Sequence, residues 1–182
     1  MKSLFAGPIA LAAVAGVAGV AEAQVVSPSL YGSVGYNRKS DSDLSTVQLR
    51  LGGRFGSYFG VEGEAGLGVD PDTATFPSVP ALQVKNQLRR EFAAYAVGYY
   101  PVSPNLDVFA RLGYGTTDFK RTFAQAPNVS VVKFGAESVN YGIGGQYFLD
   151  GKNGVRVDYT RQDFNKGVKT DDTWSVAYTR RF

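Results

Sequence analysis

The chain has 182 residues, with 19 Lys and Arg against 16 Asp and Glu, and a formal net charge of +3 at pH 7. This length allows one domain, and so small and dispersed a basic excess argues against a nucleic-acid partner. The chain contains no Cys and no His, so it has no disulfides and lacks the usual nucleophile–base pairs and most transition-metal sites. We therefore expect neither an enzyme nor a bound cofactor.

Residues 1–23 have the features of a cleaved export signal. Lys2 gives a positive start, residues 4–20 are apolar and rich in Ala, Gly and Val, and Ala21-Glu22-Ala23 places small residues where a signal peptidase reads them. After residue 20 no apolar run approaches the roughly 18 residues of a membrane helix. The sequence predicts a signal peptide over 1–23 and one mature domain over 24–182, with a retained N-terminal anchor as the alternative.

Eight segments of the remaining chain alternate between apolar and polar residues with period two. Such alternation predicts β-strands, and no segment has a convincing helical period. In the first four segments the apolar phase contains Leu30, Val34 and Tyr36; Val47, Leu49, Leu51 and Phe55; Phe59, Val61, Ala65, Leu67 and Val69; and Ala93, Tyr95, Val97 and Tyr99. In the last four it contains Leu106, Val108, Ala110, Leu112 and Tyr114; Val139, Tyr141, Ile143 and Tyr147; Val155, Val157 and Tyr159; and Trp174, Val176, Tyr178 and Phe182.

The connections between these segments alternate in length. Short turns are expected at 56–58, 101–105 and 150–154, and longer polar loops at 38–45, 70–89, 115–137 and 164–172. Short turns on one side and long loops on the other are typical of transmembrane β-barrels. The pattern predicts an all-β protein, an eight-stranded antiparallel up-and-down barrel with both ends of the chain on the short-turn side.

The composition of the two phases indicates which one faces outward. The apolar phase carries aromatic residues near both strand ends, as in the two interfacial girdles of a membrane barrel. These are Tyr36, Tyr114, Tyr159 and Trp174 toward the long loops, and Phe55, Phe59, Tyr99, Tyr147 and Phe182 toward the short turns. The other phase mixes small residues with balanced charges, which suits a narrow lumen better than the outer face of a soluble, ligand-carrying barrel.

The first short turn fixes a register that brings opposite charges together. If Phe55 and Phe59 pair across a three-residue turn, Arg50 faces Glu64 and Arg54 lies diagonal to Glu62. The same reasoning at the third turn pairs Leu149 with Val155, and therefore Gln146 with Asp158.

These pairings belong to an inward-facing charge cluster. Its predicted members are Arg50, Arg54, Glu62, Glu64, Arg111, Arg156 and Asp158, with Asp107 in the same phase. The cluster is either a gate whose ion pairs exchange partners or a plug that neutralises buried charges. We expect the plug, because eight strands leave an interior just wide enough for side chains.

The export signal, the eight alternating strands and the terminal series Trp174, Val176, Tyr178, Phe182 resemble the small bacterial outer-membrane β-barrel proteins of the opacity and OmpX type. The resemblance covers residues 24–182. It implies an outer-membrane location, among outer-membrane lipids and lipopolysaccharide. In that family the last strand is recognised by the barrel-assembly machinery, so the resemblance implies this role for those four residues.

The long loops are the part of such a protein that meets the outside. Loop 70–89 is unusually apolar for an exposed loop, and loop 115–137 carries Lys120, Arg121 and Lys133 among aromatic residues. These loops suit contact with host surfaces, proteins or lipopolysaccharide phosphates, unless they fold back as strand extensions. We expect a surface protein whose barrel is an anchor and whose loops serve binding, adhesion or envelope maintenance. The alternative is a narrow small-solute channel or hydrophobe conduit.

Overall fold

The computed structural model describes residues 28–40, 42, 44–70, 72–77, 82–125, 128–165 and 169–182. The predicted signal peptide over residues 1–23 lies outside them and stays a prediction. Within the described residues, no helix has the length and apolar character needed to cross a membrane.

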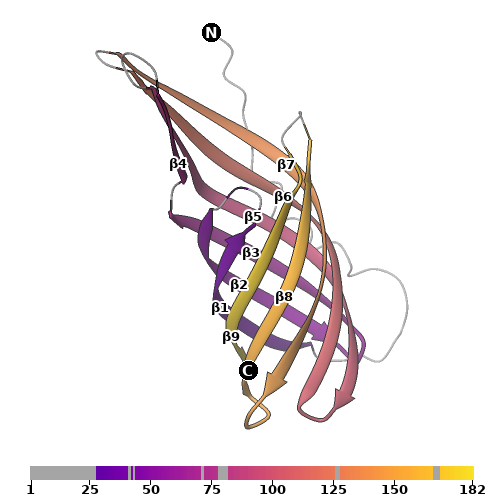
Figure 1. Cartoon of the computed structure of the whole chain (residues 1–182). Helices are drawn as coiled ribbons and strands as arrows, with labels where there is room; N and C mark the ends of the chain where they lie inside the picture. The colour runs from indigo at the N-terminus through magenta and orange to yellow at the C-terminus, as the bar shows by residue number, and fades with distance from the viewer. Residues whose placement is uncertain are drawn as a thin grey trace.

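One antiparallel sheet closes on itself to form the barrel (Figure 1). The eight strands of the barrel wall are β1 (Ser29–Lys39), β2 (Ser45–Phe55), β3 (Phe59–Asp70), β5 (Leu82–Ser103), β6 (Leu106–Gln125), β7 (Asn128–Phe148), β8 (Asn153–Phe164) and β9 (Asp171–Arg181). A short additional strand, β4 (Asp72–Phe76), pairs with β5 and with no other strand of the described residues. The wall runs β3-β2-β1-β9-β8-β7-β6-β5 and is closed by pairing of β3 with β5, which confirms the predicted up-and-down barrel.

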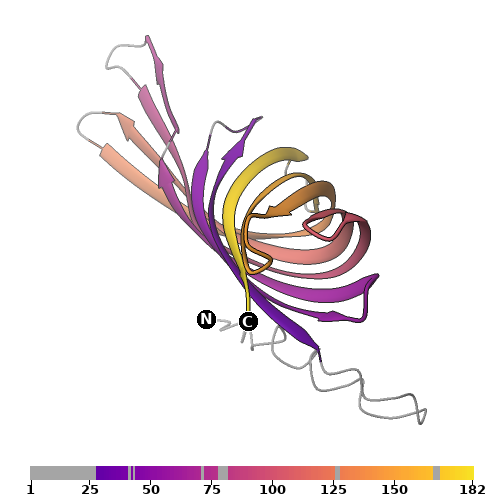
Figure 2. The same cartoon turned by 90° about the horizontal axis from the view of Figure 1, so that it is seen from below.

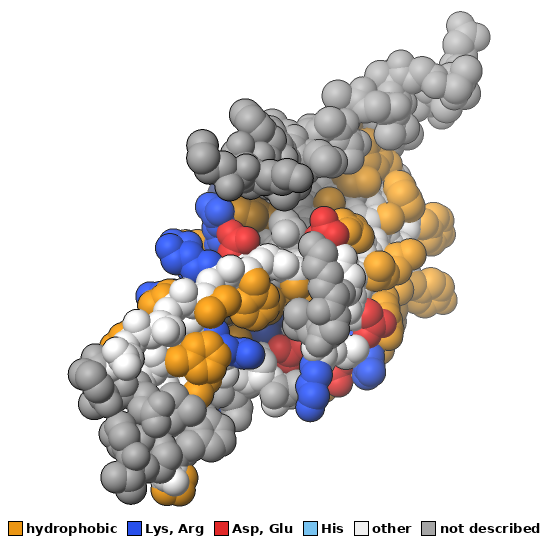
Figure 3. All heavy atoms as spheres, turned by 90° about the horizontal axis from the view of Figure 1, so that it is seen from above, with side chains coloured by type: hydrophobic (Ala, Val, Ile, Leu, Met, Phe, Trp, Pro, Cys, Tyr) orange, Lys and Arg blue, Asp and Glu red, His pale blue; other side chains and the backbone are white. Residues whose placement is uncertain are grey.

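Apolar side chains cover the outside of this wall, and polar side chains fill the inside. Leu51 and Ile143 expose 62% and 66% of their surface on the outer wall, whereas Arg50 and Arg156 are completely buried in the lumen. Figure 3 shows hydrophobic side chains along the outer wall and charged side chains gathered around the upper end of the barrel. This distribution is the reverse of that in a soluble protein, so the outer wall suits lipid and not water.

The face assignment predicted for the fourth segment, now part of β5, is wrong. Tyr95, Val97 and Tyr99 are buried inside the barrel, and Tyr100 is the residue that lies outside, 67% exposed. Tyr99 therefore does not belong to the outer aromatic girdle. Both phases of residues 93–100 consist of small or aromatic residues, so alternation alone did not distinguish them. Glu91, which is buried in the same phase as Tyr95, carries the signal that marks the inner face.

The first short turn has the predicted register, and the third does not. Phe55 pairs with Phe59 across residues 56–58, with Gly56 at φ 64°. At the third turn Tyr147, and not Leu149, pairs with Val155. Gln146 consequently faces Arg156 and not Asp158.

The third turn begins earlier than predicted because of its own side-chain chemistry. The Asp150 carboxylate accepts hydrogen bonds from the backbone N–H groups of Lys152 (3.0 Å) and Asn153 (2.5 Å). Gly151, at φ 77°, takes the left-handed conformation at the apex. Together they end β7 at Phe148, which pairs with Gly154.

Two of the expected long loops are largely β-structure. β4 pairs with the start of β5, residues 82–90 of β5 pair with residues 118–125 of β6, and residues 116–125 of β6 pair with 128–137 of β7. These segments form a four-stranded sheet, which we call the wing. Figures 1 and 2 show it leaning outward beyond the barrel rim. The prediction of loops at 70–89 and 115–137 is thus wrong for most of these residues, and the strand extensions considered as the alternative are confirmed.

The Asp150 turn generates a prediction about acid stability. Hydrogen bonds from the backbone and side chain of Asn153 and from the backbone of Lys152 lower the pKa of Asp150 to about 2. A carboxyl whose pKa is lower in the folded than in the unfolded state stabilises the fold fully above its ordinary pKa of about 4. That stabilisation is lost as the pH falls from about 4 through about 2.

We therefore expect Asp150→Ala to unfold at lower urea than the parent at pH 7, and the difference to shrink as the pH falls below about 4. The single Trp of the chain supplies the fluorescence signal. Asp150→Asn keeps an acceptor oxygen, so it should unfold at a urea concentration between those of the parent and of Asp150→Ala. A difference that is constant down to pH 2 would contradict the role of the ionised carboxylate.

Candidate functional site

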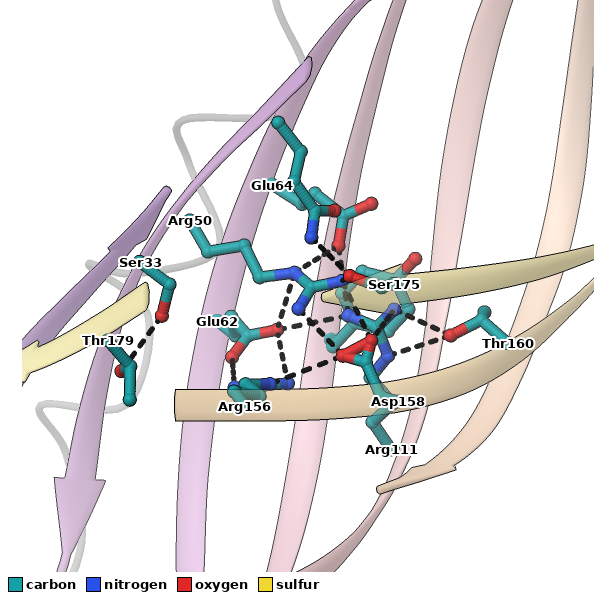
Figure 4. Close-up of polar contacts among 12 residues, drawn as sticks. Ser33, Arg50, Glu62, Glu64, Arg111, Arg156, Asp158, Thr160, Ser175 and Thr179 are labelled. Carbon is teal, nitrogen blue, oxygen red and sulfur yellow. Dashed lines mark hydrogen bonds and ion pairs between the residues drawn. The ribbon is translucent and has the colours of Figure 1, made fainter. Parts of the chain in front are cut away.

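Six charged side chains from four strands meet in the middle of the barrel interior (Figure 4). This lumen cluster consists of Arg50 on β2, Glu62 and Glu64 on β3, Arg111 on β6, and Arg156 and Asp158 on β8. Each occupies an inward-facing position of its strand, so the alternation found in the sequence is what brings them together. Sequence reasoning predicted all six.

Arg50 is held by partners from two sides of the lumen. Its Nε donates to Glu64 Oε2 at 2.7 Å, as the predicted cross-strand pairing requires. Its two Nη atoms donate to both oxygens of Asp158, at 2.7 and 3.0 Å. A guanidinium presents several donors in one plane, and Arg50 uses this geometry to join β2 to β8 across the barrel.

Arg111 and Arg156 complete the network. Arg111 Nη1 donates to Glu62 at 3.2 Å and to Glu64 at 2.9 Å. Arg156 donates to Glu62 at 2.6 Å and to Asp158 at 3.2 Å. Their guanidinium groups also lie over aromatic rings, Arg111 over Tyr95 at 4.3 Å and Arg156 over Phe109 at 4.1 Å. Each of these two guanidinium groups therefore pairs with carboxylates and lies over an aromatic ring.

The cluster is electrically balanced and closed to water. It joins three guanidinium groups to three carboxylates, and no member exposes more than the 7% of Glu64. Side chains that lined a water-filled passage would stay accessible to water. Burying so many charges is tolerated only when each is paired and hydrogen-bonded. The geometry supports the interpretation of a plug.

Arg54 lies diagonal to Glu62 as predicted, but its side chain does not join this cluster, so its predicted membership is wrong. Its Nη1 pairs with Asp107 at 2.8 Å near the short-turn end, and its guanidinium lies over the Tyr99 ring at 4.5 Å. The inward-facing Tyr99, which the sequence placed outside, supplies the surface that directs Arg54 away. Asp107 also binds Arg181 at 2.7 Å, a partner that sequence reasoning missed although Arg181 shares the inward phase of Thr179.

A third charged layer, also missed, closes the lumen toward the wing. Lys39 Nζ lies 3.1 Å from Glu91 Oε2 and donates to Gln162 Oε1. Lys39 and Glu91 are both buried, and each continues the inward phase of its strand. The signal was present in the alternation, but Lys39 stands in the segment 38–45 that we assigned to a loop, and Glu91 lies between the predicted loop 70–89 and the first residue named in the fourth segment.

The wing is fixed to the barrel by aromatic packing on its inner face. The rings of Phe119 and Phe134 stack at 5.4 Å, and Phe164 of β8 meets Phe119 edge-on at 5.9 Å. On the same face Arg121 Nε donates to Asn86 Oδ1 at 2.7 Å. These contacts hold the wing as a formed sheet and not as a set of loose loops.

One long edge of the wing is free among the described residues. Pairing of β7 with β8 begins at Ser138 and Phe164, and just beyond it Asn165 N donates to Glu137 O at 2.9 Å. No described residue pairs with residues 128–136 on that side. In an antiparallel strand the N–H and C=O of one residue point to the same side, and every second residue repeats this direction. Because Glu137 faces β8, the residues at 129, 131, 133 and 135 present their N–H and C=O groups to this free edge.

The residues predicted to signal assembly lie on the outer wall at the end of the chain. Trp174, Val176 and Tyr178 project outward from β9, and Phe182 is 74% exposed. The Phe182 N–H donates to Leu30 O at 2.9 Å, which attaches the last residue to the first strand. The outer girdle is confirmed at Trp174, whose ring packs against that of Tyr159 at 5.2 Å.

Comparison with protein families gives a match over almost the whole chain. The family model described as outer membrane protein beta-barrel domain matches residues 9–182. No curated protein is similar enough to count as a match.

Solved structures resemble this one in fold. Ail, the attachment invasion locus protein of Yersinia pestis, solved with the heparin analogue sucrose octasulfate, superposes with a TM-score of 0.59 at 17% identity, covering 85% of this chain and 99% of that one. The outer membrane protein OprG of Pseudomonas aeruginosa gives 0.57 at 13% identity, covering 85% and 96%. The N-terminal barrel of OprF from the same organism gives 0.56 at 11% identity, covering 85% and 97%.

The lumen cluster predicts strong energetic coupling between Arg50 and Glu64. Arg50→Met or Glu64→Gln alone leaves the buried cluster with one uncompensated charge, which costs about 3–5 kcal/mol. The double variant should lose less unfolding free energy than the two single variants lose together. It should not recover fully, because Asp158 and Arg111 also lose a contact.

Urea unfolding of the barrel in lipid vesicles measures this coupling in a double-mutant cycle. Arg54→Met combined with Glu64→Gln is the matched control, because Arg54 pairs with Asp107 and shares no partner with Glu64. In this control the effects of the two substitutions on the unfolding free energy should add within about 0.5 kcal/mol. Simple additivity in the Arg50 cycle would show that this pair does not hold the cluster together.

Proposed function

Because the chain belongs to the family of outer membrane proteins with a β-barrel domain, we propose that it is a surface-binding protein of the outer membrane. The barrel is its anchor, and the wing is its binding element. The observation that carries this proposal is the free edge of β7, residues 128–136, on a sheet that stands outside the barrel wall.

An open strand edge is a template for another strand. It presents a row of unpaired N–H and C=O groups, and proteins usually blunt such edges with proline, bulges or several charges. Residues 128–136 contain no Pro and one charged residue, Lys133, and their pairing with β6 has no register shift. Valines at 129, 131 and 132 favour the extended conformation. These features support a retained edge that pairs with a partner.

The chemistry of the edge indicates the class of partner. A row of backbone donors and acceptors binds an extended polypeptide segment by adding it to the sheet as a further strand. Val129 and Val131, 66% and 50% exposed, flank this edge and offer apolar contacts to alternate side chains of the incoming strand. The proposed ligand is thus an extended segment of a protein on another surface. The name of Ail, an attachment protein of the same fold, is in keeping with such a role.

A solute channel is the less favoured role. The lumen cluster, the Lys39–Glu91 pair and the Arg54–Asp107 pair stand one above another in the interior, and the cluster itself is closed to water. A conducting barrel would need these ion pairs to separate together. We propose a closed, non-catalytic anchor.

The proposed binding mode predicts a specific effect of proline at Val131. The N–H of this residue points to the free edge, so Val131→Pro removes a donor to the partner while leaving the N–H groups that bond β6 in place. Attachment of non-adherent Gram-negative cells displaying the variant to an epithelial monolayer should fall severalfold. Val131→Thr, which keeps the N–H, is the matched control and should attach as the parent does. Equal attachment by both variants would show that the edge is not used.

The end of β9 is proposed to be the signal for the barrel-assembly machinery. Its exposed aromatic residues, Trp174, Tyr178 and Phe182, lie on the outer wall, where a recognition factor has access before membrane insertion. Deleting Phe182 should lower the amount of heat-modifiable, membrane-embedded barrel without changing synthesis. Phe182→Tyr keeps the aromatic ring and should assemble normally. Normal levels after the deletion would place the signal elsewhere.

A further inference from the structure

The outer face of the wing continues the lipid-facing side of the barrel. On β6 the outward phase runs from Leu112 and Tyr114 through Asp118, Lys120 and Thr122, and the pairing of β6 with β7 has no register shift along this length. The same alternation places Arg121 on the opposite, inner face, where its guanidinium lies 5.8 Å from the Phe134 ring. The two faces of the wing therefore differ in chemistry, although the residues that form them are neighbours in sequence.

Lysines from three strands stand together on this outer face, which we call the lysine face. Lys120 of β6 pairs directly with Lys133 of β7 and, on its other side, with Gln87 of β5. In the next row outward, Lys85 of β5 pairs with Thr122. Neighbouring strands are about 4.8 Å apart and alternate rows about 7 Å, so the three ammonium groups can reach one point.

The acidic side chain in the adjacent row of this face is already paired. Asp118, in the next row toward the barrel, accepts from Arg90 Nε at 2.6 Å. None of Lys85, Lys120 and Lys133 forms an ion pair with another described residue. Like charges placed directly opposite each other weaken a sheet. An anion bound between Lys120 and Lys133 would relieve this repulsion.

The position of the lysine face indicates where such an anion comes from. The wing leans outward beyond the barrel rim in both views (Figures 1 and 2), so its outer face is turned toward the membrane that surrounds the barrel. Tyr114, an outward aromatic residue of the upper girdle, lies six residues before Lys120 on the same strand. Exposed Val129 and Val131 share this face, which is therefore both basic and partly apolar.

We propose that the lysine face binds the phosphate groups of glycolipid headgroups in the outer leaflet. Charge attraction by Lys85, Lys120 and Lys133 supplies the specificity for phosphate, and the two valines favour a lipid surface over a soluble anion. The contact holds the wing against the membrane at a fixed angle. Its charge contacts use the lysines of one face of the wing, whereas the proposed protein-binding function uses the backbone groups of the edge, so either proposal can fail alone.

The test uses the full chain folded in phosphatidylcholine vesicles that contain increasing fractions of lipid A, a glycolipid with two phosphates. The chain has no Cys, so Gln83→Cys on the outer face carries a single fluorescent label. Quenching by headgroup-spin-labelled phosphatidylcholine reports how closely the wing approaches the membrane. We expect quenching to rise with the lipid A fraction, to weaken with added salt, and to be absent with dephosphorylated lipid A.

The lysine variants decide whether this face is responsible. Lys120→Gln and Lys133→Gln should each raise the half-saturating lipid A fraction roughly fivefold, and the triple variant with Lys85→Gln by on the order of 100-fold. Lys120→Arg keeps the charge and should respond as the parent does. Arg121→Gln makes the same change of charge on the opposite face and should leave the fraction unchanged.

Several results would overturn the proposal. One is an unchanged half-saturating fraction in the triple variant, with the folded barrel verified by its heat-modifiable mobility. Another is an equal response to dephosphorylated lipid A. If soluble heparin binds the detergent-folded protein through these lysines while lipid A has no effect, the face belongs to a sulfated glycan and not to the membrane.

Discussion

In the hydrocarbon core of a membrane no water is present to bond the peptide groups, so every N–H and C=O of a spanning segment needs a partner within the protein. A β-sheet meets this requirement only when it has no edge. Pairing of β1 with β9, from Tyr31 opposite Arg181 to Lys39 opposite Thr173, and of β3 with β5 removes both edges of the wall. With eight strands the closed ring is narrow, and its interior is filled by side chains. The ion-pair layers of the lumen follow from that narrowness.

The same requirement explains why the free edge of β7 occurs where it does. From Ser138 onward β7 is paired on both sides, and over residues 128–136 the described structure pairs it on one side only. The change coincides with departure from the barrel wall, where water becomes available to the open backbone groups. An open edge is thus compatible with this fold only beyond the membrane. The wing carries that edge on a support stiffened by Phe119, Phe134 and Phe164.

The sequence predicted those features in which charge and alternation agree. Arg50 opposite Glu64 followed from a three-residue turn and two phases that differ clearly in polarity. The faces of β5 were not predictable from residues 93–100, because a tyrosine fits the lipid girdle as well as an interior hydrogen bond. The Tyr99 hydroxyl in fact donates to that of Tyr31 at 2.8 Å. The wing was missed because its basic and polar residues are those of an exposed loop, and a sheet with both faces outside the membrane has no simple alternation.

The partners of Arg50 also differ in when they become available to it. Glu64 is 14 residues away and belongs to the adjacent hairpin strand, whereas Asp158 is 108 residues away on β8. Local contacts form long before contacts that close a large loop. Arg50 therefore has one carboxylate from the first hairpin onward and gains the second only when the last third of the chain arrives. This second partner lies on β8, next to β9, whose pairing with β1 closes the ring, so full neutralisation of the central guanidinium belongs to the last stage of barrel closure.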